Sequence, residues 1–437
     1  MSEPERLSLA IHKFKLLKSA KNGEELAQVI PIDSVYTERV LDDIWNGKGS
    51  WNVLYEETTT MEKKKVQLWE EMTLLHFQAA AMYRQEDFMA SYKHQLDMYN
   101  VYLRELPNMS RWGVPALFAI SNDLSHIARC ADQQQSATDP YARKIEEATR
   151  TISQGFSLCM TDREVLLSKS RKWGTYHMAN ILFRLYLRLK AYNLCTSMIQ
   201  AIKTSELPAL DHFPMGDHVA FRFHRGMLAF RGEKYALAKD DLLFALEHCH
   251  HNAFRNKIRI LVHLAPIMMM EGMLPQSRLL RRYPPIKALY ADLAKAVRTG
   301  NIGQFDLLLQ AKEQKLAALG TYTAAEQVRK VAVRQLLYKV YRLENKASRI
   351  SFVKFQAAFA AAGLSNMELA EVECILADMI FGGYMKGRSI GSRDCGSPGN
   401  SMYDWFQYPM TGNLANCVRY MSYNKDIRGS REQGKVD

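Results

Sequence analysis

A cluster of histidines around one cysteine is the densest group of side chains that could do chemistry. His248, Cys249, His250 and His251 are consecutive, and His263 follows downstream. Imidazole and thiolate groups bind zinc when about four of them converge at about 2.0–2.3 Å. Cys249, however, belongs to the buried stripe of a predicted helix, and no HExxH or paired-cysteine string is present. The pattern therefore favours a helix end, where histidines complement the helix dipole, and predicts no metal site.

No other string in the sequence supports catalysis. Gly300-Asn301-Ile302-Gly303 lacks the Gly-Lys-Ser/Thr ending and the preceding strand of a phosphate loop, so a turn between two helices is expected. No Gly-x-Ser-x-Gly string occurs, and scattered acids do not make an acid–base pair. The seven cysteines form no CxxC pair and predict no disulfide framework. We expect no enzyme, no catalytic residue and no cofactor; an enzymatic function would need a bound metal or cofactor.

Basic residues are the stronger candidates for a function. The chain carries 58 Lys and Arg against 46 Asp and Glu, a net charge of +12. Residues 255–349 hold 18 basic and 6 acidic side chains, so this segment alone accounts for the whole excess. An excess of this size predicts an anionic partner, which could be nucleic acid, a phosphoinositide surface or an acidic protein.

The spacing of these cations predicts stripes on helix faces. Arg278, Arg281 and Arg282 share one face, and Arg329 with Lys330 and Arg334 share another. The residues predicted to bind nucleic acid are Arg278, Arg281, Arg282, Arg329, Lys330, Arg334, Lys339, Lys386, Arg388 and Arg393. Without an RNA-recognition aromatic motif or a zinc finger, such stripes would track phosphates and would not read bases. The alternative for each residue is an ordinary solvated position.

The elements that position these residues are helices, because apolar residues recur with a helical period almost throughout the chain. Residues 218–249 show the repeating unit. Its first helix is expected to bury Val219, Phe223, Met227 and Phe230, and Gly232 is expected to supply the turn. The second helix has an apolar face from residue 235 to 249. Similar breaks are found at 84–88, 190–193 and 298–305, as in irregular tetratricopeptide-like repeats.

After residue 345 the pattern changes to two short helices followed by a strand and a tight turn, the order of a winged helix. Ser365 and Glu368 predict a capping box that opens the second helix, and Gly382-Gly383 predict its end. The predicted fold is all-α, a helical-repeat superhelix ending in a winged helix. The expected segments are an N-terminal helical extension (1–60), N-terminal helical repeats (61–215), further helical repeats (216–345), the winged helix (346–392) and a divergent tail (393–437).

Several strings resemble one branch of the PCI superfamily, whose members join helical repeats to a terminal winged helix. These strings are Lys172-Trp173-Gly174, residues 179–186, Leu194-Cys195, Phe213-Pro214, residues 245–250 with Asn256-Lys257, residues 371–377, residues 383–387, residues 112–117 and Ala131-Asp132-Gln133-Gln134. They are similar to the PCI subunit of the nuclear-pore-associated transcription-and-export complex and to its close relative, a signalosome-associated PCI protein. The resemblance covers roughly residues 65–390.

The resemblance implies a non-enzymatic scaffold and RNA-binding platform in an mRNA export complex, located in the nucleus at the nuclear pore. It implies a hetero-oligomer with a GANP-type PCI scaffold protein and the small acidic protein also found in the proteasome lid. RNA or single-stranded nucleic acid would bind non-specifically. The longest apolar segment, residues 264–270, is too short to span a membrane. We expect no secretory signal, because the N-terminal residues have no basic region followed by an apolar stretch.

Two alternatives stay open. After Lys386-Gly387 the family continues with a basic, Gln-rich wing strand and a Pro-rich end, whereas this chain has Arg388-Ser389-Ile390 and a different tail. The first alternative is a signalosome-associated or splicing-linked PCI subunit with another scaffold. The second is a pure protein–protein adaptor with no role in RNA binding.

Overall fold

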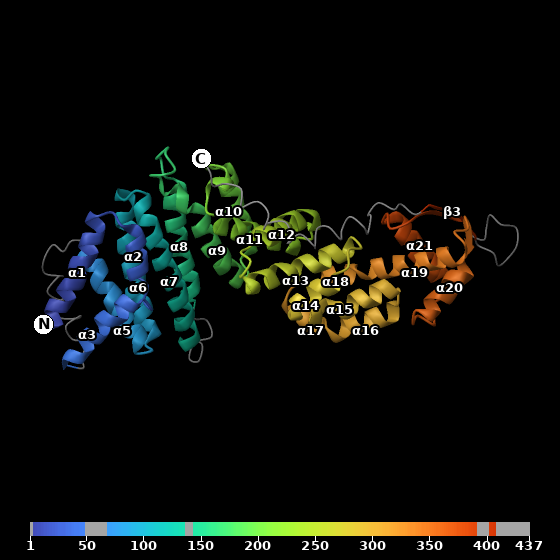
Figure 1. The fold of residues 1–437 in the computed structure, drawn as a ribbon, viewed down its shortest axis with the longest axis horizontal. Helices are drawn as coiled ribbons and strands as arrows, with labels where there is room; N and C mark the ends of the chain where they lie inside the picture. Colours follow the sequence, from blue (N-terminus) through green and yellow to red (C-terminus); the bar gives the residue numbers. More distant parts are fainter. Residues whose placement is uncertain (1–2, 49–67, 136–142, 391–401, 408–437) are drawn as a thin grey trace, which may run out of the picture. The chain divides into compact units, whose positions relative to one another are not determined.

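The computed structural model describes residues 3–48, 68–135, 143–390 and 402–407 (Figure 1). Most of them are helical, and the strands form one small sheet. The chain divides into two compact units between His224 and Arg225. The expected all-α class is therefore confirmed. No helix in the described ranges is long and apolar enough to cross a membrane.

The first unit is a stack of helices. In chain order they are α1 (Glu3–Ser19), α2 (Gly23–Val29), α3 (Val35–Lys48), α5 (Leu68–Arg84), α6 (Phe88–Glu105), α7 (Val114–Gln135), α8 (Lys144–Met160), α9 (Thr175–Arg188) and α10 (Tyr192–Thr204). Short 3-10 turns connect several of them, and α11 (Met215–Arg231) runs across the boundary between the units.

The second unit continues with shorter helices and ends in the winged helix. The helices are α12 (Tyr235–His248), α13 (Phe254–Met270), α14 (Ser277–Arg282), α15 (Pro284–Thr299), α16 (Ile302–Ala311), α17 (Glu313–Ala318), α18 (Tyr322–Gln327), α19 (Arg329–Leu343), α20 (Phe352–Ala361) and α21 (Leu369–Phe381). The strands are β1 (Arg349–Ser351), β2 (Lys386–Ile390) and β3 (Met402–Gln407).

The turns between paired helices share one backbone device. After α5, α9 and α11 a non-glycine residue takes a left-handed conformation: Glu86 (φ 61°), Lys190 (φ 56°) and Glu233 (φ 56°). The next amide then donates back to a carbonyl five residues earlier, as in Lys234 N to Ala229 O at 2.9 Å. The three helix breaks predicted outside residues 218–249 are confirmed, because α5 ends at Arg84, α9 at Arg188 and α15 at Thr299.

The turn of the hairpin at 218–249 lies at Gly232 and Glu233, and Glu233 adopts the left-handed conformation there. The buried face of α11 was predicted wrongly in part: Phe221, Ala229 and Phe230 are buried, whereas Val219, Phe223 and Met227 are only half-buried. Two buried histidines, His218 and His224, lie on this face, and apolar periodicity alone does not count histidine. The second helix follows the prediction, with Ala238, Leu242 and Ala245 fully buried.

The sheet of the winged helix takes in residues that sequence analysis placed in the tail. β3 lies between β1 and β2 and is antiparallel to both, with Tyr403 opposite Ile350 on one side and Ser389 on the other. The wing therefore extends past residue 392. The strand at 402–407 is short and isolated in the sequence, so periodicity did not reveal it; only its Tyr, Trp and Phe residues indicated β-structure.

Helix α21, the second helix of the winged helix, begins three residues later than predicted. Its N-cap residue is Glu368, and the amide of Glu368 donates to Glu371 Oε2 at 3.2 Å. The predicted capping box of Ser365 and Glu368 was therefore wrong, and the box is formed by Glu368 and Glu371. A carboxylate at the N-cap serves as well as a hydroxyl because both accept hydrogen bonds from first-turn amides.

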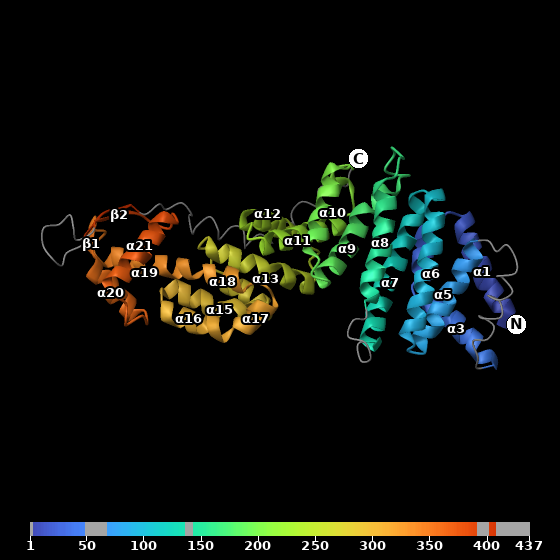
Figure 2. The ribbon, with the colours of Figure 1, turned by 180° about the vertical axis from the view of Figure 1, so that it is seen from behind.

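The winged helix is joined to the repeats through α19 and through a close contact of main chains. Val333, Leu336 and Leu337 of α19 lie in one core with Phe355 and Phe359 of α20, and both views show α20 and α21 beside α19 (Figures 1 and 2). Gly303 N, at the start of α16, donates to Ala362 O at 2.8 Å. A Cβ atom on Gly303 would approach that oxygen and Gly363 Cα to 3.0 Å, so glycine is needed there.

We predict that Glu233→Gly stabilises the second unit. Glycine adopts φ near 56° without the strain that a side chain causes, and the expected gain is about 0.5–1 kcal/mol in the free energy of unfolding. Chemical denaturation measures it. The control is Lys234→Gly, whose φ is −82° and which should lower stability. Equal losses in both variants would contradict the assignment of strain to Glu233.

We also predict that Gly303→Ala destabilises the protein by about 1–3 kcal/mol, because the methyl group overpacks the joint with the winged helix. Gly216 is the matched control, since it is also the second residue of a helix and its Cβ would meet nothing within 4 Å. Gly216→Ala should leave the free energy of unfolding unchanged or raise it. A neutral Gly303→Ala variant would show that the joint can relax.

Candidate interaction surface

Helix α21 occupies the place of the helix that helix-turn-helix proteins insert into the major groove of DNA. Its 13 residues include Glu371, Glu373 and Asp378 and contain no lysine or arginine. A helix with this charge is repelled by phosphates. The geometry of the winged helix thus presents an acidic element where a nucleic-acid reader would present a basic one.

The outward side of α21 is also apolar. Ala370, Cys374, Ala377 and Phe381 follow helical spacing and are all exposed; we call them the α21 face. Phe381 is 94% exposed at the last position of the helix. Large apolar residues are also exposed elsewhere in the winged-helix region, with Leu343 at the end of α19 at 81% and Val353 on α20 at 51%. Grouped exposed apolar side chains of this kind mark protein-binding surfaces.

The predicted cations of α19 interact with other residues of the protein. Arg329 Nε and Nη2 donate to the two carboxylate oxygens of Asp306 at 2.8 and 2.9 Å. Lys330 Nζ lies 3.2 Å from Asp378 Oδ2 of α21. Each of these contacts ties α19 to a neighbouring helix.

The next two cations of α19 are also held by the fold. Lys339 Nζ donates to Thr299 O at 2.6 Å, and Arg334 is half-buried and has an interaction partner. Arg329, Lys330 and Lys339 therefore connect α19 to neighbouring helices, which the spacing of the cations in the sequence did not indicate.

The other predicted cations lie on two separate elements. Arg278, Arg281 and Arg282 are exposed on α14, and Arg282 Cζ lies 5.7 Å from the ring centre of Phe254. Lys386 is exposed on β2. Figure 1 shows α14 and the winged helix toward opposite ends of the second unit, so these cations do not form one continuous stripe.

Two predicted cations cannot be placed fully. Arg388 lies in β2 opposite Asp404 of β3, but its side chain is outside the described residues. Arg393 is outside them altogether. A nucleic-acid site made of the ten predicted residues thus stays a prediction. The structure brings together only two local groups of them, one on α14 and one on α19.

The periodicity of the sequence did not reveal the α21 face. The helical spacing of apolar residues in α21 predicts a buried stripe of Leu369, Val372, Ile375, Leu376, Met379 and Ile380. Val372, Leu376 and Met379 are buried, but Leu369 is 43% exposed. The available signal was Phe381, an apolar residue off the stripe and directly before two glycines.

The histidine cluster is explained by helix ends and packing. His248 Nδ1 donates to Phe244 O at 3.0 Å, and its ring stacks on that phenylalanine. His263 Nδ1 donates to Arg259 O at 3.1 Å, and burial lowers the pKa of His263. Within the part of the chain that the structure describes, no group of three or more His, Cys, Asp or Glu side chains is placed to hold a metal ion.

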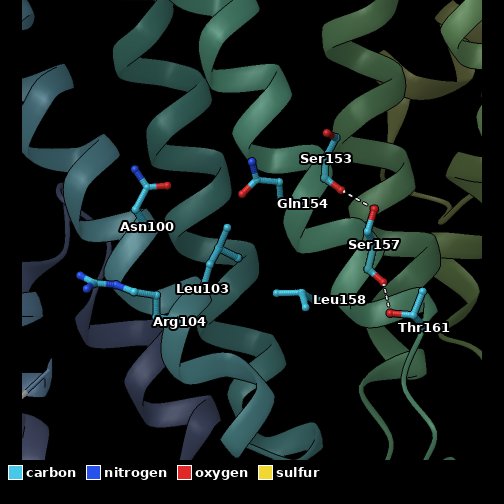
Figure 3. A pocket seen from close by; sticks show the side chains of 8 residues that line it. All are labelled: Asn100, Leu103, Arg104, Ser153, Gln154, Ser157, Leu158 and Thr161. Carbon is cyan, nitrogen blue, oxygen red and sulfur yellow. Dashed lines mark hydrogen bonds between the residues drawn. The ribbon is translucent and has the colours of Figure 1, made fainter.

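A hollow of about 640 Å³ lies between α6 and α8 in the first unit (Figure 3). Leu103 and Leu158 point toward each other from the two helices, below the carboxamides of Asn100 and Gln154. The lining residues are Asn100, Leu103, Arg104, Ser153, Gln154, Ser157, Leu158 and Thr161. Because none of them is a carboxylate, imidazole or thiol, this hollow offers no acid–base or nucleophilic pair.

Comparison with known proteins gives the chain its family. No family model matches the sequence. The protein CSN12 homolog of Schizosaccharomyces pombe is 34% identical over 343 residues, which cover 75% of this chain and 81% of that protein. The CSN12 homolog of Neurospora crassa is 28% identical over 86% of this chain and 94% of its own length. PCI domain-containing protein 2 of Danio rerio is 28% identical over 73% of this chain and 80% of its own. With its helical repeats and terminal winged helix, the chain belongs to the PCI-protein family of the CSN12 homologs and PCI domain-containing protein 2.

Proposed function

We propose that this protein is a non-enzymatic adaptor, a PCI subunit that holds another protein through its winged helix. The observation that carries the proposal is the α21 face, which is exposed, apolar and flanked by carboxylates. Phe381 supplies the large side chain that anchors such interfaces, and the small residues at 370, 374 and 377 let a partner approach the helix closely.

The partner that we propose is a larger PCI scaffold of the GANP type, in a nuclear hetero-oligomer. The family supports a scaffold subunit of this kind. The exposed Phe381 ring predicts an apolar pocket on the partner. The small acidic proteasome-lid-type protein is a further proposed subunit, suited to the basic segment at 255–349. The identity of the scaffold distinguishes an export complex from a signalosome-associated or splicing-linked one.

We predict that Phe381→Ala weakens binding of the scaffold by at least tenfold, because truncating a central aromatic anchor costs about 2 kcal/mol or more. Isothermal titration with the co-expressed scaffold from the same organism measures the affinity. The melting temperature should not fall, since the side chain is 94% exposed.

The control for this experiment is Val165→Ala, which shortens an apolar side chain that is 91% exposed in the first unit. Its affinity should stay within twofold of the unmodified protein. Equal losses in both variants, or none in Phe381→Ala, would rule out the α21 face as the docking site.

A second candidate function is the RNA-binding platform of an mRNA export complex. It is favoured by Arg278 and Arg281, which are exposed and have no carboxylate within ion-pair distance among the residues that the structure describes. Cations free of such pairing can neutralise phosphates. In this proposal the RNA-binding platform is centred on α14, and Arg329 and Lys330 of α19, which are paired with carboxylates, stabilise the fold.

We predict different results for the two groups of cations. Arg329→Gln should leave the RNA affinity of the assembled complex unchanged within twofold and lower the free energy of unfolding by about 0.2–1 kcal/mol, because it breaks a partly exposed ion pair. A double variant, Arg278→Gln with Arg281→Gln, should weaken RNA binding and reduce its salt dependence. Filter binding at three salt concentrations measures both. A loss of RNA affinity in Arg329→Gln that exceeds twofold would show that α19 also belongs to the RNA-binding platform.

A further inference from the structure

A hollow of about 530 Å³ in the first unit is lined by an excess of carboxylates, and we call it the α3–α5 pocket. Its charged lining residues are Asp33, Glu38, Asp42, Glu86 and Arg84. Four negative charges and one positive charge give it a net charge of −3, in a chain whose own net charge is +12. Arg84 Nη1 lies 2.6 Å from Asp42 Oδ1, whereas the other three carboxylates have no cation partner among the described residues.

The rest of the lining is apolar or aromatic. Ile32, Leu41 and Ala80 are at most 7% exposed, and the rings of Tyr83 and Phe88 are half-buried. These two rings meet edge to face, with 5.5 Å between their centres. Arginine and lysine side chains match such a lining, because their aliphatic stems pack on apolar surface while the charged head reaches a carboxylate.

Helix α7 holds both of the turns that carry carboxylates into the pocket. Asp123 Oδ2 accepts a hydrogen bond from Ile32 N at 3.1 Å, in the turn before α3. In the turn between α5 and α6, Gln134 accepts from Phe88 N and donates to Glu86 O, both at 3.0 Å. The positions of these turns are therefore set by hydrogen bonds to one helix, and the pocket is a part of the fold.

Asp123 adds a charge that the protein does not neutralise. Its only hydrogen bond in the described part of the chain is the one from Ile32 N, and no cation is paired with it there. Burial raises the pKa of Asp123 to about 7, because the Ile32 amide offsets only part of the effect and Asp33 adds to it. Buried carboxylates are normally paired, and a cation bound beside Asp33 would favour the ionised form of Asp123.

The ligand that fits this charge is not a metal ion. Among the described residues, no three His, Cys, Asp or Glu side chains are placed to hold one. Carboxylates that are spread around a hollow are satisfied by several cations on one chain. Guanidinium suits this pocket better than ammonium, since it donates to a carboxylate in pairs and stacks on rings such as those of Tyr83 and Phe88.

We propose that the α3–α5 pocket binds an arginine-rich segment of a partner protein. The guanidinium groups pair with Asp33, Glu38 and Glu86, and their stems lie on Leu41 and Phe88. This site belongs to the first unit and does not rest on the proposed adaptor function, which uses the α21 face of the second unit. Phe381→Ala should leave it unchanged, so the two proposals fail independently.

The test is fluorescence polarisation of the full-length protein with fluorescein-labelled hexa-arginine. A double variant, Asp33→Asn with Glu38→Gln, should weaken binding about fivefold, because each exposed ion pair is worth roughly a two- to threefold change. The control is Asp97→Asn with Glu206→Gln, which removes two carboxylates from exposed positions of the same unit outside the pocket. It should change the affinity by less than twofold, since salt screens distant exposed charges.

Two single variants should change the affinity in opposite directions. Arg84→Gln should strengthen binding about two- to threefold, because it removes the cation of the pocket and frees Asp42 for the ligand. Asp123→Asn should weaken binding about threefold, since it removes a charge beside the pocket while its amide oxygen still accepts from Ile32 N. The melting temperature of Asp123→Asn should stay the same or rise, because the variant buries no unpaired charge.

Three results would overturn the proposal. These are equal losses in the two double variants, unchanged or weaker binding in Arg84→Gln, and binding of hexalysine as tight as that of hexa-arginine. Sedimentation of the protein alone tests a second copy of this chain as the occupant. Self-association that disappears in the variant Asp33→Asn with Glu38→Gln would assign the pocket to that copy and would also overturn the proposal.

Discussion

Helix α19 belongs to two hydrophobic cores at once, and the rest of the second unit depends on this. Its first turns place Val331 and Ala332 in the core of the repeats, while Leu336, Leu337 and Val340 lie in the core of the winged helix. One rigid helix thus fixes the direction in which the winged helix faces. Two cations of α19, Arg329 and Lys330, form ion pairs with Asp306 and Asp378. These two residues therefore contribute to the packing of α19 against its neighbours.

The proposed functional surfaces therefore lie away from α19. On one side is the α21 face, which is proposed to bind a protein. On the other, among the residues that the structure describes, the arginines of α14 have no carboxylate within ion-pair distance. A basic segment with a net charge of +12 can therefore contain both structural ion pairs and free cations, and only the neighbours of each residue separate the two kinds. Charge counts along the chain do not contain that information.

Much of the fold could be predicted because local signals and the final structure agree. Helical periods, the breaks near Arg84, Lys190 and Thr299, and the order of two short helices before a strand are properties of neighbouring residues. The errors involve contacts between distant residues or residues with two possible roles. Glu368 serves as the N-cap of α21, and the left-handed residue in the turn after α11 is Glu233, which follows the expected Gly232. Histidines took buried positions on α11. Phe381 lies outside because its position on α21 is in phase with the exposed Ala370, Cys374 and Ala377 and not with the buried Leu376 and Met379.

The order of strands in the winged helix has a consequence for synthesis. In the strand order β1-β3-β2, the last of the three described strands to leave the ribosome lies in the middle of the sheet. β1 and β2 do not pair with each other, so neither has a strand neighbour until residues 402–407 are available. The helices of the cap can assemble on α19 during translation, but its sheet must wait. A nascent chain stopped before residue 402 would carry two open strand edges, which are surfaces that chaperones recognise and that other nascent chains can pair with.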